Sequence, residues 1–319
     1  MTPDQTPKTA SDYPELIQPR ECPFEAFPES TVFAEGVVVL PADLSERSCM
    51  MHTGIEYAVK DGMALHLDII EPRQAEDEGL VFPLILFIQG SAWHLQNMGQ
   101  QLAQLSRFAR RGYVIAVVQY RPSDLAPFPA QVVDTKTALR TMRAHAETYH
   151  ADPNRIVVWG DSSGGHTAVM VGMTLDNPVL DDGSPAFDPL AVRAVVDYYG
   201  PSDISRMNEE PSIQDHVAPD SPEGMLIGGV SVLENMDRVA PTITTSYISR
   251  EHEIPPFLIL HGNKDRLVPF GQSVMLFEAL KAADKVVECY QLRGAEHGGS
   301  AFWTEAVLDI VEAFIRRFI

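Results

Sequence analysis

Residues 156–165 read Ile-Val-Val-Trp-Gly-Asp-Ser-Ser-Gly-Gly, and a helical pattern continues over 167–175. The four apolar residues are typical of a buried strand, so Ser162 stands in a tight turn between strand and helix, the context of a nucleophile elbow. Such a turn strains the backbone of the serine and leaves room only for glycine two positions away on either side. This stretch therefore predicts a nucleophilic serine, and a glycine-rich turn without chemistry is the weaker alternative.

Further strands and helices alternate on both sides of this turn. The strands are apolar almost throughout, as expected when helices cover both faces of a parallel sheet. We predict strands over 83–88, 113–118, 156–159, 194–198, 257–260 and 286–292. We predict helices over 101–110, 130–149, 273–283 and 303–318. This alternation predicts an α/β protein with a doubly wound, mostly parallel sheet.

The chain of 319 residues is expected to hold one catalytic domain, because α/β domains of this size often remain single units. Residues 1–53 show no sustained period and are interpreted as an N-terminal arm. The catalytic domain is expected over 54–319, starting with an edge hairpin of strands 55–59 and 65–70 around an Asp-Gly turn. Scattered Pro, Gly and acidic residues at about 205–255 predict a small lid-like insertion, with an ordinary long connection as the alternative.

The net charge of the chain limits the kinds of partner that it can bind. There are 24 Lys and Arg against 44 Asp and Glu, a formal net charge of −20, without a basic cluster that would follow phosphates. Nucleic acid is therefore not expected as a ligand, and an anionic membrane surface is disfavoured. A small neutral ester suits this field better than a highly anionic substrate. The sequence leaves the oligomeric state open, a homo-oligomer included.

The start of the chain and its cysteines bear on its location. Residues 1–15 are polar and acidic, without the cationic and apolar segments of a secretory signal. No apolar stretch approaches the roughly 20 residues that span a bilayer. Cys22, Cys49 and Cys289 are odd in number and have no metal-binding spacing, which predicts free thiols in a reducing compartment. We therefore expect a soluble, cytoplasmic protein.

A serine hydroxyl is a weak nucleophile, so a base and an orienting acid are expected downstream in the order Ser, Asp, His. Asp265 follows the strand at 257–260 and His297 follows the strand at 286–292, which places both in loops at the carboxyl ends of core strands. We predict His297 as general base and Asp265 as the acid that orients it. Acyl transfer by these groups requires neither a metal nor an organic cofactor.

Each of these assignments has an alternative. Asp265 could only cap its turn, and Glu296 is a rival acid, although adjacent side chains rarely point the same way as His297. His261 also ends a strand and is a rival base, but we expect its ring to bond the backbone. His166, on the helix after the elbow, is expected to be structural.

Backbone amides from two places are expected to bind the oxyanion. Ser163, directly after the nucleophile, supplies one. The strand at 84–88 runs into Gln-Gly-Ser-Ala-Trp at 89–93, where the amides of Ser91 and Ala92 can approach a ligand. A plain turn of small residues is the alternative for this loop.

Trp93 and His94 follow the oxyanion loop and are candidates for binding the leaving group. An aromatic face there would stack on a sugar or phenolic ring. Packing of Trp93 beneath the loop is an equally weighted alternative.

These motifs resemble those of α/β-hydrolase esterases with a His-Gly-Gly-Gly-Trp loop and a Gly-Asp-Ser-Ala-Gly-Gly elbow. The group includes hormone-sensitive-lipase-like, kynurenine-formamidase-like and bacterial acetyl/feruloyl esterase-like branches, and the last is the most similar. The resemblance runs from about Tyr57 to the C-terminus and includes recurrent segments at 128–134, 152–156 and 261–265. It implies an α/β-hydrolase fold and a serine carboxylesterase.

The chain departs from that pattern beside the predicted oxyanion hole. Gln89 replaces the histidine that usually braces the loop, Ser91 and Ala92 replace glycines, and Ser163 replaces alanine. The side chains at 91 and 92 should narrow the space beside the oxyanion and favour a small acyl group.

The expected function is hydrolysis of small, acetyl-like esters, with carbohydrate and phenolic alcohols as candidate leaving groups. An amide hydrolase such as an arylformamidase is one alternative, and it would share every catalytic residue. A catalytically silent binding protein on the same fold is another, and an intact Ser-His-Asp set argues against it.

Overall fold

The computed structural model describes residues 17–43, 46–73 and 79–319. The chain divides into two units, Met1–Asp43 and Leu44–Ile319. In the described part of the first unit, a short 3-10 helix spans Phe24–Ala26, and apolar side chains such as Phe24 are exposed. The sequence predicted the division at 53/54, ten residues later than this boundary at 43/44.

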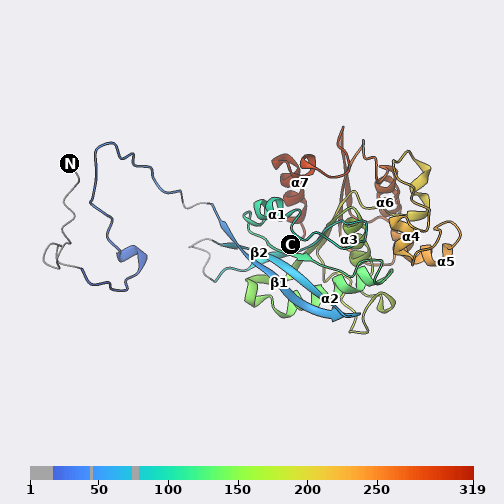
Figure 1. Ribbon diagram of the computed structural model, residues 1–319, viewed down its shortest axis with the longest axis horizontal. Coiled ribbons are helices and arrows are strands. Elements are labelled where there is room, and N and C mark those ends of the chain that lie inside the picture. Colours follow the sequence, from blue (N-terminus) through green and yellow to red (C-terminus); the bar gives the residue numbers. More distant parts are fainter. Residues whose placement is uncertain (1–16, 44–45, 74–78) are drawn as a thin grey trace, which may run out of the picture. The chain divides into compact units, whose positions relative to one another are not determined.

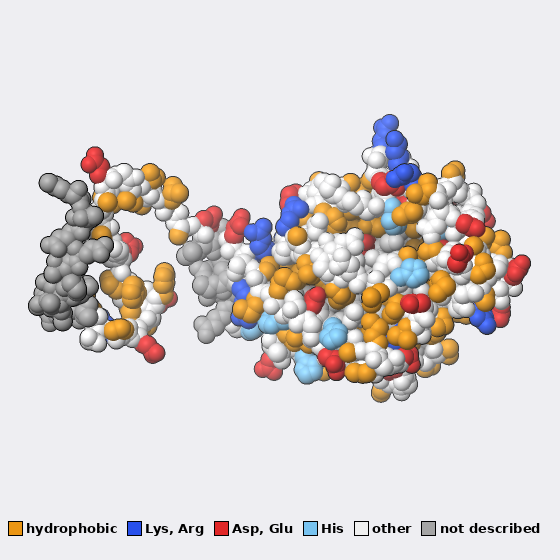
Figure 2. Space-filling view, viewed as in Figure 1, with side chains coloured by type: hydrophobic (Ala, Val, Ile, Leu, Met, Phe, Trp, Pro, Cys, Tyr) orange, Lys and Arg blue, Asp and Glu red, His pale blue; other side chains and the backbone are white. Residues whose placement is uncertain are grey.

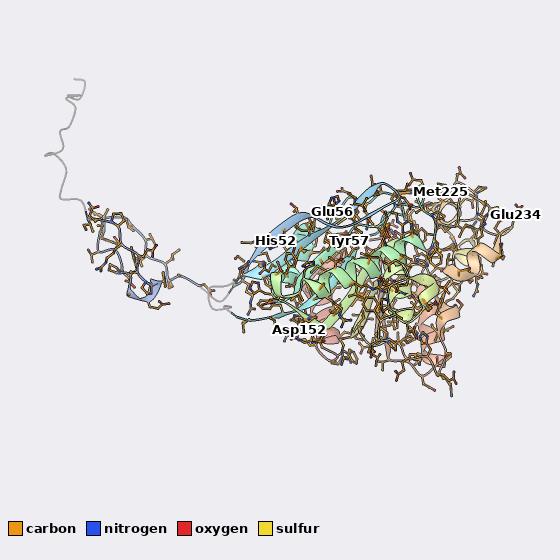
Figure 3. The ribbon with its side chains drawn as sticks, turned by 90° about the horizontal axis from the view of Figure 1, so that it is seen from below. His52, Glu56, Tyr57, Asp152, Met225 and Glu234 are labelled. Atoms are coloured by element: carbon orange, nitrogen blue, oxygen red, sulfur yellow. The ribbon has the colours of Figure 1, made fainter. Side chains whose placement is uncertain are left out.

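Strand β1, Ser48–Lys60, begins seven residues before the predicted start of the hairpin. Its first residues pair with the end of β2, Met63–Arg73, for example Ser48 with Arg73 and His52 with Ile69. All side chains of β1 are exposed or half-buried, so its sequence shows no clear alternation of apolar and polar residues. Figure 3 shows His52, Glu56 and Tyr57 following one another along β1.

Eight strands form one sheet in the order β1-β2-β4-β3-β5-β6-β7-β8. The β1-β2 and β2-β4 pairs are antiparallel and all the others are parallel, so the predicted edge hairpin and mostly parallel sheet are confirmed. The remaining strands are β3 (Phe82–Ile88), β4 (Val114–Val118), β5 (Ala151–Asp161), β6 (Ala194–Tyr198), β7 (Phe257–Gly262) and β8 (Val287–Leu292).

Helices cover both faces of this sheet, as the alternating pattern predicted. Side chains along β3 alternate between two hydrophobic clusters, because successive residues of a strand point to opposite faces. Helices α1 (Leu102–Ala109) and α7 (Glu305–Ile315) pack on one face. Helices α2 (Ala130–Ala144), α3 (Ser163–Met173) and α6 (Gly271–Ala282) pack on the other. Figure 1 shows α1 and α7 on the side of the hairpin away from α2.

Two predicted helices are each five residues shorter in the structure. The predicted helix at 130–149 ends at Ala144, and a 3-10 helix follows at Glu147–Tyr149. Helix α7 begins at Glu305 rather than at 303, because the side chain of Thr304 accepts a hydrogen bond from the amide of Val307 and caps the helix there.

The connection between β6 and β7 holds only short helices, the longest of them η5 at Ile204–Glu209. Apolar side chains of this connection form a small cluster of their own, to which Trp93 also belongs. Figure 3 labels Met225 and Glu234 in it, at the end of the unit opposite His52 and Asp152. The other helices of the connection are α4 (Pro222–Leu226), α5 (Met236–Val239), η6 (Ala240–Thr242) and η7 (Thr244–Tyr247).

Acidic side chains are scattered over the face shown in Figure 2 and do not gather into one patch there. All three cysteines are free and half-buried. Among the described helices, none is long and apolar enough to cross a membrane.

Candidate active site

Ser162 lies between the end of β5 and the start of α3, with φ 54° and ψ −128°. This left-handed φ is strained for a residue with a side chain. A Cβ atom on Gly160 would lie 2.1 Å from the carbonyl oxygen of Gly164, and one on Gly164 would lie 2.0 Å from that of Ile88. Both glycines are therefore required by close backbone contacts around the turn.

The three predicted catalytic side chains form one chain of contacts. Oγ of Ser162 lies 2.9 Å from Nε2 of His297, and Nδ1 of His297 lies 2.7 Å from Oδ2 of Asp265. They come from the loops after β5, β7 and β8, which all leave the sheet at the same edge. The arrangement has the hydrogen-bond order of a nucleophile, a base and an orienting acid.

The carboxylate of Asp265 is buried but well satisfied. Its Oδ1 accepts hydrogen bonds from the amides of Leu267 and Val268, at 2.8 and 2.9 Å. Burial raises the pKa of Asp265, but hydrogen bonds from His261 and His297 outweigh it, and the pKa lies well below its usual range. The carboxyl group therefore stays ionised beside His297.

His261 contacts Asp265 as well as the backbone. Its Nε2 lies 3.1 Å from Oδ2 of Asp265 and 2.9 Å from the carbonyl oxygen of Val268, while Nδ1 lies 2.7 Å from Oγ of Ser273. The ring is fully buried and both nitrogens have partners. The sequence predicted the backbone contact, and the structure adds the contact with Asp265.

The other rival groups point elsewhere. The carboxylate of Glu296 forms an ion pair with Arg266 and accepts a hydrogen bond from the Arg266 amide at 2.9 Å. His166 is buried, and its Nε2 lies 2.9 Å from the carbonyl oxygen of Thr242. Burial lowers the pKa of His166 to about 4, so its ring is neutral. Its structural assignment agrees with these contacts.

The predicted oxyanion donors do not all have a free amide. The Ser91 N–H donates to Oγ of Ser163 at 2.9 Å, so this group is committed to the protein and is not placed for an oxyanion. Within the described loop and elbow, the amides of Ala92 and Ser163 have no hydrogen-bond partner. Ala92 has φ 55°, which turns the loop sharply at this residue. Of the three predicted donors, Ala92 and Ser163 remain available.

A cavity of about 410 Å³ opens beside Ser162 and His297. Its walls come from the oxyanion loop, the start of α1 and residues 298–303. Nε2 of Gln101 donates to Oδ2 of Asp161 at 2.9 Å. The Oε1 atoms of Gln101 and Gln104 are buried and have no partner among the described residues. Both glutamines line the cavity, together with Gln100.

The structure bears on two further predictions about the surroundings of this cavity. The Trp93 side chain is 2% exposed and packs with Ile204 and Leu226 of the β6-β7 connection, because the loop turns it away from the cavity. His94 is exposed, and neither residue is among those that line the cavity. The described lining also contains no residue of 205–255, which gives the lid interpretation no support.

Tyr199 is a site residue that the sequence did not reveal. It follows β6 with φ 46°, and its ring centroid lies 4.7 Å from that of His297 in an edge-on arrangement. Its hydroxyl donates to Oδ2 of Asp161 at 3.3 Å. The available signal was its position at the end of a core strand, between those that lead to Ser162 and Asp265.

A second Ser-His-carboxylate set lies in the β6-β7 connection. Oγ of Ser212 lies 2.9 Å from Nε2 of His216, whose Nδ1 lies 2.9 Å from Oε1 of Glu223. The Ser212 hydroxyl also lies 2.9 and 3.1 Å from the carbonyl oxygens of Arg266 and Leu267, to which it donates. Because its proton is donated to carbonyl oxygens, the Ser212 hydroxyl is not poised as a nucleophile. The same hydrogen bonds connect the β6-β7 connection to the Asp265 loop.

In the described ranges, no group of three or more His, Cys, Asp or Glu side chains is arranged to hold a metal ion.

Sequence comparison gives a family and several relatives. The BD-FAE family model matches residues 67–280. The chain is similar to Esterase LipC of Mycobacterium tuberculosis, with 32% identity over 221 residues, which are 68% of this chain and 53% of LipC. Esterase LipQ of the same organism is 31% identical over 218 residues, covering 67% of this chain and 50% of LipQ. The chain spans about half the length of the curated relatives it matches.

Structure comparison finds the same fold in solved esterases. One is described as a truncated form of carbohydrate esterase from gut microbiota, with a TM-score of 0.72, 26% identity and coverage of 87% of this chain and 98% of that one. Another is the esterase Est2 of Thermogutta terrifontis with propionate bound, with a TM-score of 0.65, 25% identity and coverage of 85% and 94%.

Proposed function

The chain belongs to the BD-FAE family of α/β-hydrolase esterases, and from this we propose that it hydrolyses carboxylic esters of small acyl groups through an acyl-enzyme on Ser162. The observation that carries the proposal is the continuous series of contacts from Oγ of Ser162 through the His297 ring to Asp265, at 2.9 and 2.7 Å. Two unpartnered amides lie beside it in the loop and the elbow.

In the proposed reaction, Nε2 of His297 takes the proton of Ser162 as Oγ attacks the ester carbonyl carbon. The amides of Ala92 and Ser163 donate to the oxyanion that forms. When the tetrahedral intermediate collapses, the bond to the alcohol oxygen breaks and the proton passes from His297 to the alcohol. Water then attacks the acyl-enzyme by the same route and releases the acid.

Asp265 supports this cycle without receiving a proton. Its depressed pKa keeps it ionised, so it fixes the His297 tautomer and stabilises the imidazolium formed in each step.

The proposed acyl group is small, and acetyl is the best candidate. Ala92 lines the cavity beside Ser162, where the resembling esterases have glycine, and its methyl group occupies space that glycine would leave open. The similar esterase Est2 has been solved with propionate, another short acyl product. Both observations support a short acyl chain over a long one.

For the leaving group we propose a hydroxylated alcohol, carried by a sugar or a phenol. Gln100, Gln101 and Gln104 line the cavity, and an amide side chain can both donate to and accept from a hydroxyl group. A similar solved structure is described as a carbohydrate esterase, which supports the sugar.

The test is a set of initial rates on p-nitrophenyl acetate, butyrate and octanoate. We expect turnover to fall from acetate to octanoate and to be lost in Ser162→Ala. The matched control is Ser212→Ala, which removes a serine with the same type of histidine and carboxylate partners and should stay active. Absence of ester turnover in the wild type, with cleavage of an arylformamide, would contradict the esterase and favour the amidase. Loss of activity in Ser212→Ala alone would contradict the choice of nucleophile.

A further inference from the structure

Three hydroxyl groups from three separate elements meet behind the oxyanion loop. Ser91 belongs to the loop after β3, Tyr120 follows β4, and Ser163 begins α3. Oγ of Ser91 lies 2.9 Å from Oη of Tyr120, which lies 3.4 Å from Oγ of Ser163. The Ser163 oxygen accepts the Ser91 amide at 2.9 Å, which closes a ring of contacts.

The proton of each hydroxyl can be assigned from its partners. The Ser91 hydroxyl lies 2.6 Å from the carbonyl oxygen of His94, which can only accept, so Ser91 donates to it. Tyr120 must then donate to Ser91, and Ser163 to Tyr120. Every hydroxyl of the ring therefore donates one hydrogen bond and accepts another, and only this one set of proton positions satisfies all of them. Such closed networks specify one arrangement of the groups they join.

Two of the three residues of the ring are buried, and the third, Ser91, is half-buried and lines the cavity. The Tyr120 side chain is fully buried, and Ser163 is 2% exposed. Burial raises the pKa of Tyr120 to about 12, against the effect of the Ser163 and Ser91 hydrogen bonds, so the phenol keeps its proton over the pH range in which esterases work.

The loop in front of this ring needs such support. Ala92 and Trp93 have φ 55° and 56°, a region that glycine adopts freely and other residues adopt at a conformational cost. The free amide of Ala92 is the one proposed to bind the oxyanion. Ser91, the residue directly before it, is fixed through both its amide and its hydroxyl. The ring thus fixes the peptide plane that carries the Ala92 amide.

We propose that the Ser163 hydroxyl, with Tyr120 and Ser91, positions the Ala92 amide for the oxyanion, a task for which glycine at 91 and 92 and alanine at 163 would offer no side-chain group. The inference rests on the proposed esterase activity. Ser163 and Tyr120 are positioning residues here, because their hydroxyls act through the loop and not on the substrate.

The test compares Ser163→Ala and Tyr120→Phe with the wild type on p-nitrophenyl acetate. We expect each variant to lower kcat about tenfold, with KM changed less than twofold. This is less than the loss of about 10²–10³-fold from a missing oxyanion donor, because the Ala92 amide remains and is only held less firmly. Acylation and deacylation both use the oxyanion hole, so kcat falls whichever step limits turnover. The kcat of the double variant should lie within about twofold of the kcat of either single variant, because both substitutions break the same ring.

The matched control is Thr167→Val, one turn further along α3. Its buried hydroxyl donates to the carbonyl oxygen of Ser163 at 2.9 Å and takes no part in the ring. A loss of kcat that came only from general loosening of α3 would appear in this variant as well.

Hydrogen exchange gives a readout that does not depend on turnover. Amides at 89–95 should exchange faster in Ser163→Ala than in the wild type or in Thr167→Val. Unchanged kcat and unchanged exchange in both ring variants would overturn the inference while leaving an active esterase intact. An inactive wild type would instead overturn the proposed function, and the exchange comparison would still decide whether the ring holds the loop.

Discussion

Asp265 is buried and yet remains charged, because four donors converge on its two oxygens. Asparagine at this position would keep the size of the side chain but remove the charge that stabilises the imidazolium. We expect Asp265→Asn to lower kcat by about 10⁴-fold, the size of the loss when the orienting acid of a serine hydrolase is removed. Steady-state kinetics on p-nitrophenyl acetate measures this.

Glu296→Gln is the matched control for that substitution. Glu296 is the residue next to His297, but its carboxylate is paired with Arg266 at the surface. The kcat of the Glu296→Gln variant should stay within about twofold of the wild-type value, because an exposed ion pair contributes little. Equal losses in the two variants would show that the acid has been assigned wrongly.

Among the secondary-structure elements, the β6-β7 connection is hydrogen-bonded to the loop that carries Asp265. The buried His216-Glu223 pair holds Ser212, whose hydroxyl bonds the Arg266 and Leu267 carbonyls. Ile213 adds a backbone bond to Arg266 at 2.9 Å. These polar contacts join the connection to the Asp265 loop, and Tyr247, Ile248 and Ile254 of the connection pack against the cluster on one face of the sheet.

His216→Ala would leave Glu223 buried without its partner. We expect the free energy of unfolding to fall by about 2–4 kcal/mol, the usual cost of an unpaired buried polar or charged group. Urea denaturation followed by tryptophan fluorescence measures it. Removal of the exposed Arg206-Glu209 pair by Glu209→Gln is the control and should leave the midpoint unchanged. If the urea midpoint of His216→Ala equals that of the wild type, the His216-Glu223 pair does not stabilise this connection.

At the scale of the whole molecule, a buried carboxyl group in the sheet should make stability depend on pH. Asp197 lies on β6, and burial raises its pKa to about 7, against the Gly200 amide that donates to Oδ1. The unfolded chain releases this proton near pH 4. Between about pH 4 and pH 7 only the unfolded state ionises, so the stability contributed by the protonated group is lost as pH rises.

Asp197→Asn removes this titration. We expect the denaturation midpoint of the wild type to fall more between pH 5 and pH 8 than that of the variant, because asparagine has no proton to lose in this window. Urea titrations at the two pH values give the comparison. The same change in midpoint in both proteins would mean that Asp197 ionises normally in the folded state.

The sequence predicted those parts that depend on local pattern. The glycines around Ser162, the apolar strands and the order of Asp265 and His297 follow from steric and topological rules that act along the chain. Trp93 was weighed equally between ligand and packing, and contacts with the distant β6-β7 connection decide for packing. The Ser91 amide was predicted as a donor to the oxyanion, but the Ser163 hydroxyl occupies it. Such outcomes depend on tertiary contacts that no short stretch of sequence contains.

The burial of Trp93 among the side chains of the β6-β7 connection bears on which part of the molecule unfolds first. The oxyanion loop and the connection share one small cluster, separate from the two clusters on the faces of the sheet. Regions that share a core tend to unfold locally as one cooperative unit. Heat inactivation would then begin in this unit while the sheet remains folded. Substitutions at 204–243 could therefore set the working temperature of the enzyme without touching any residue of its active site.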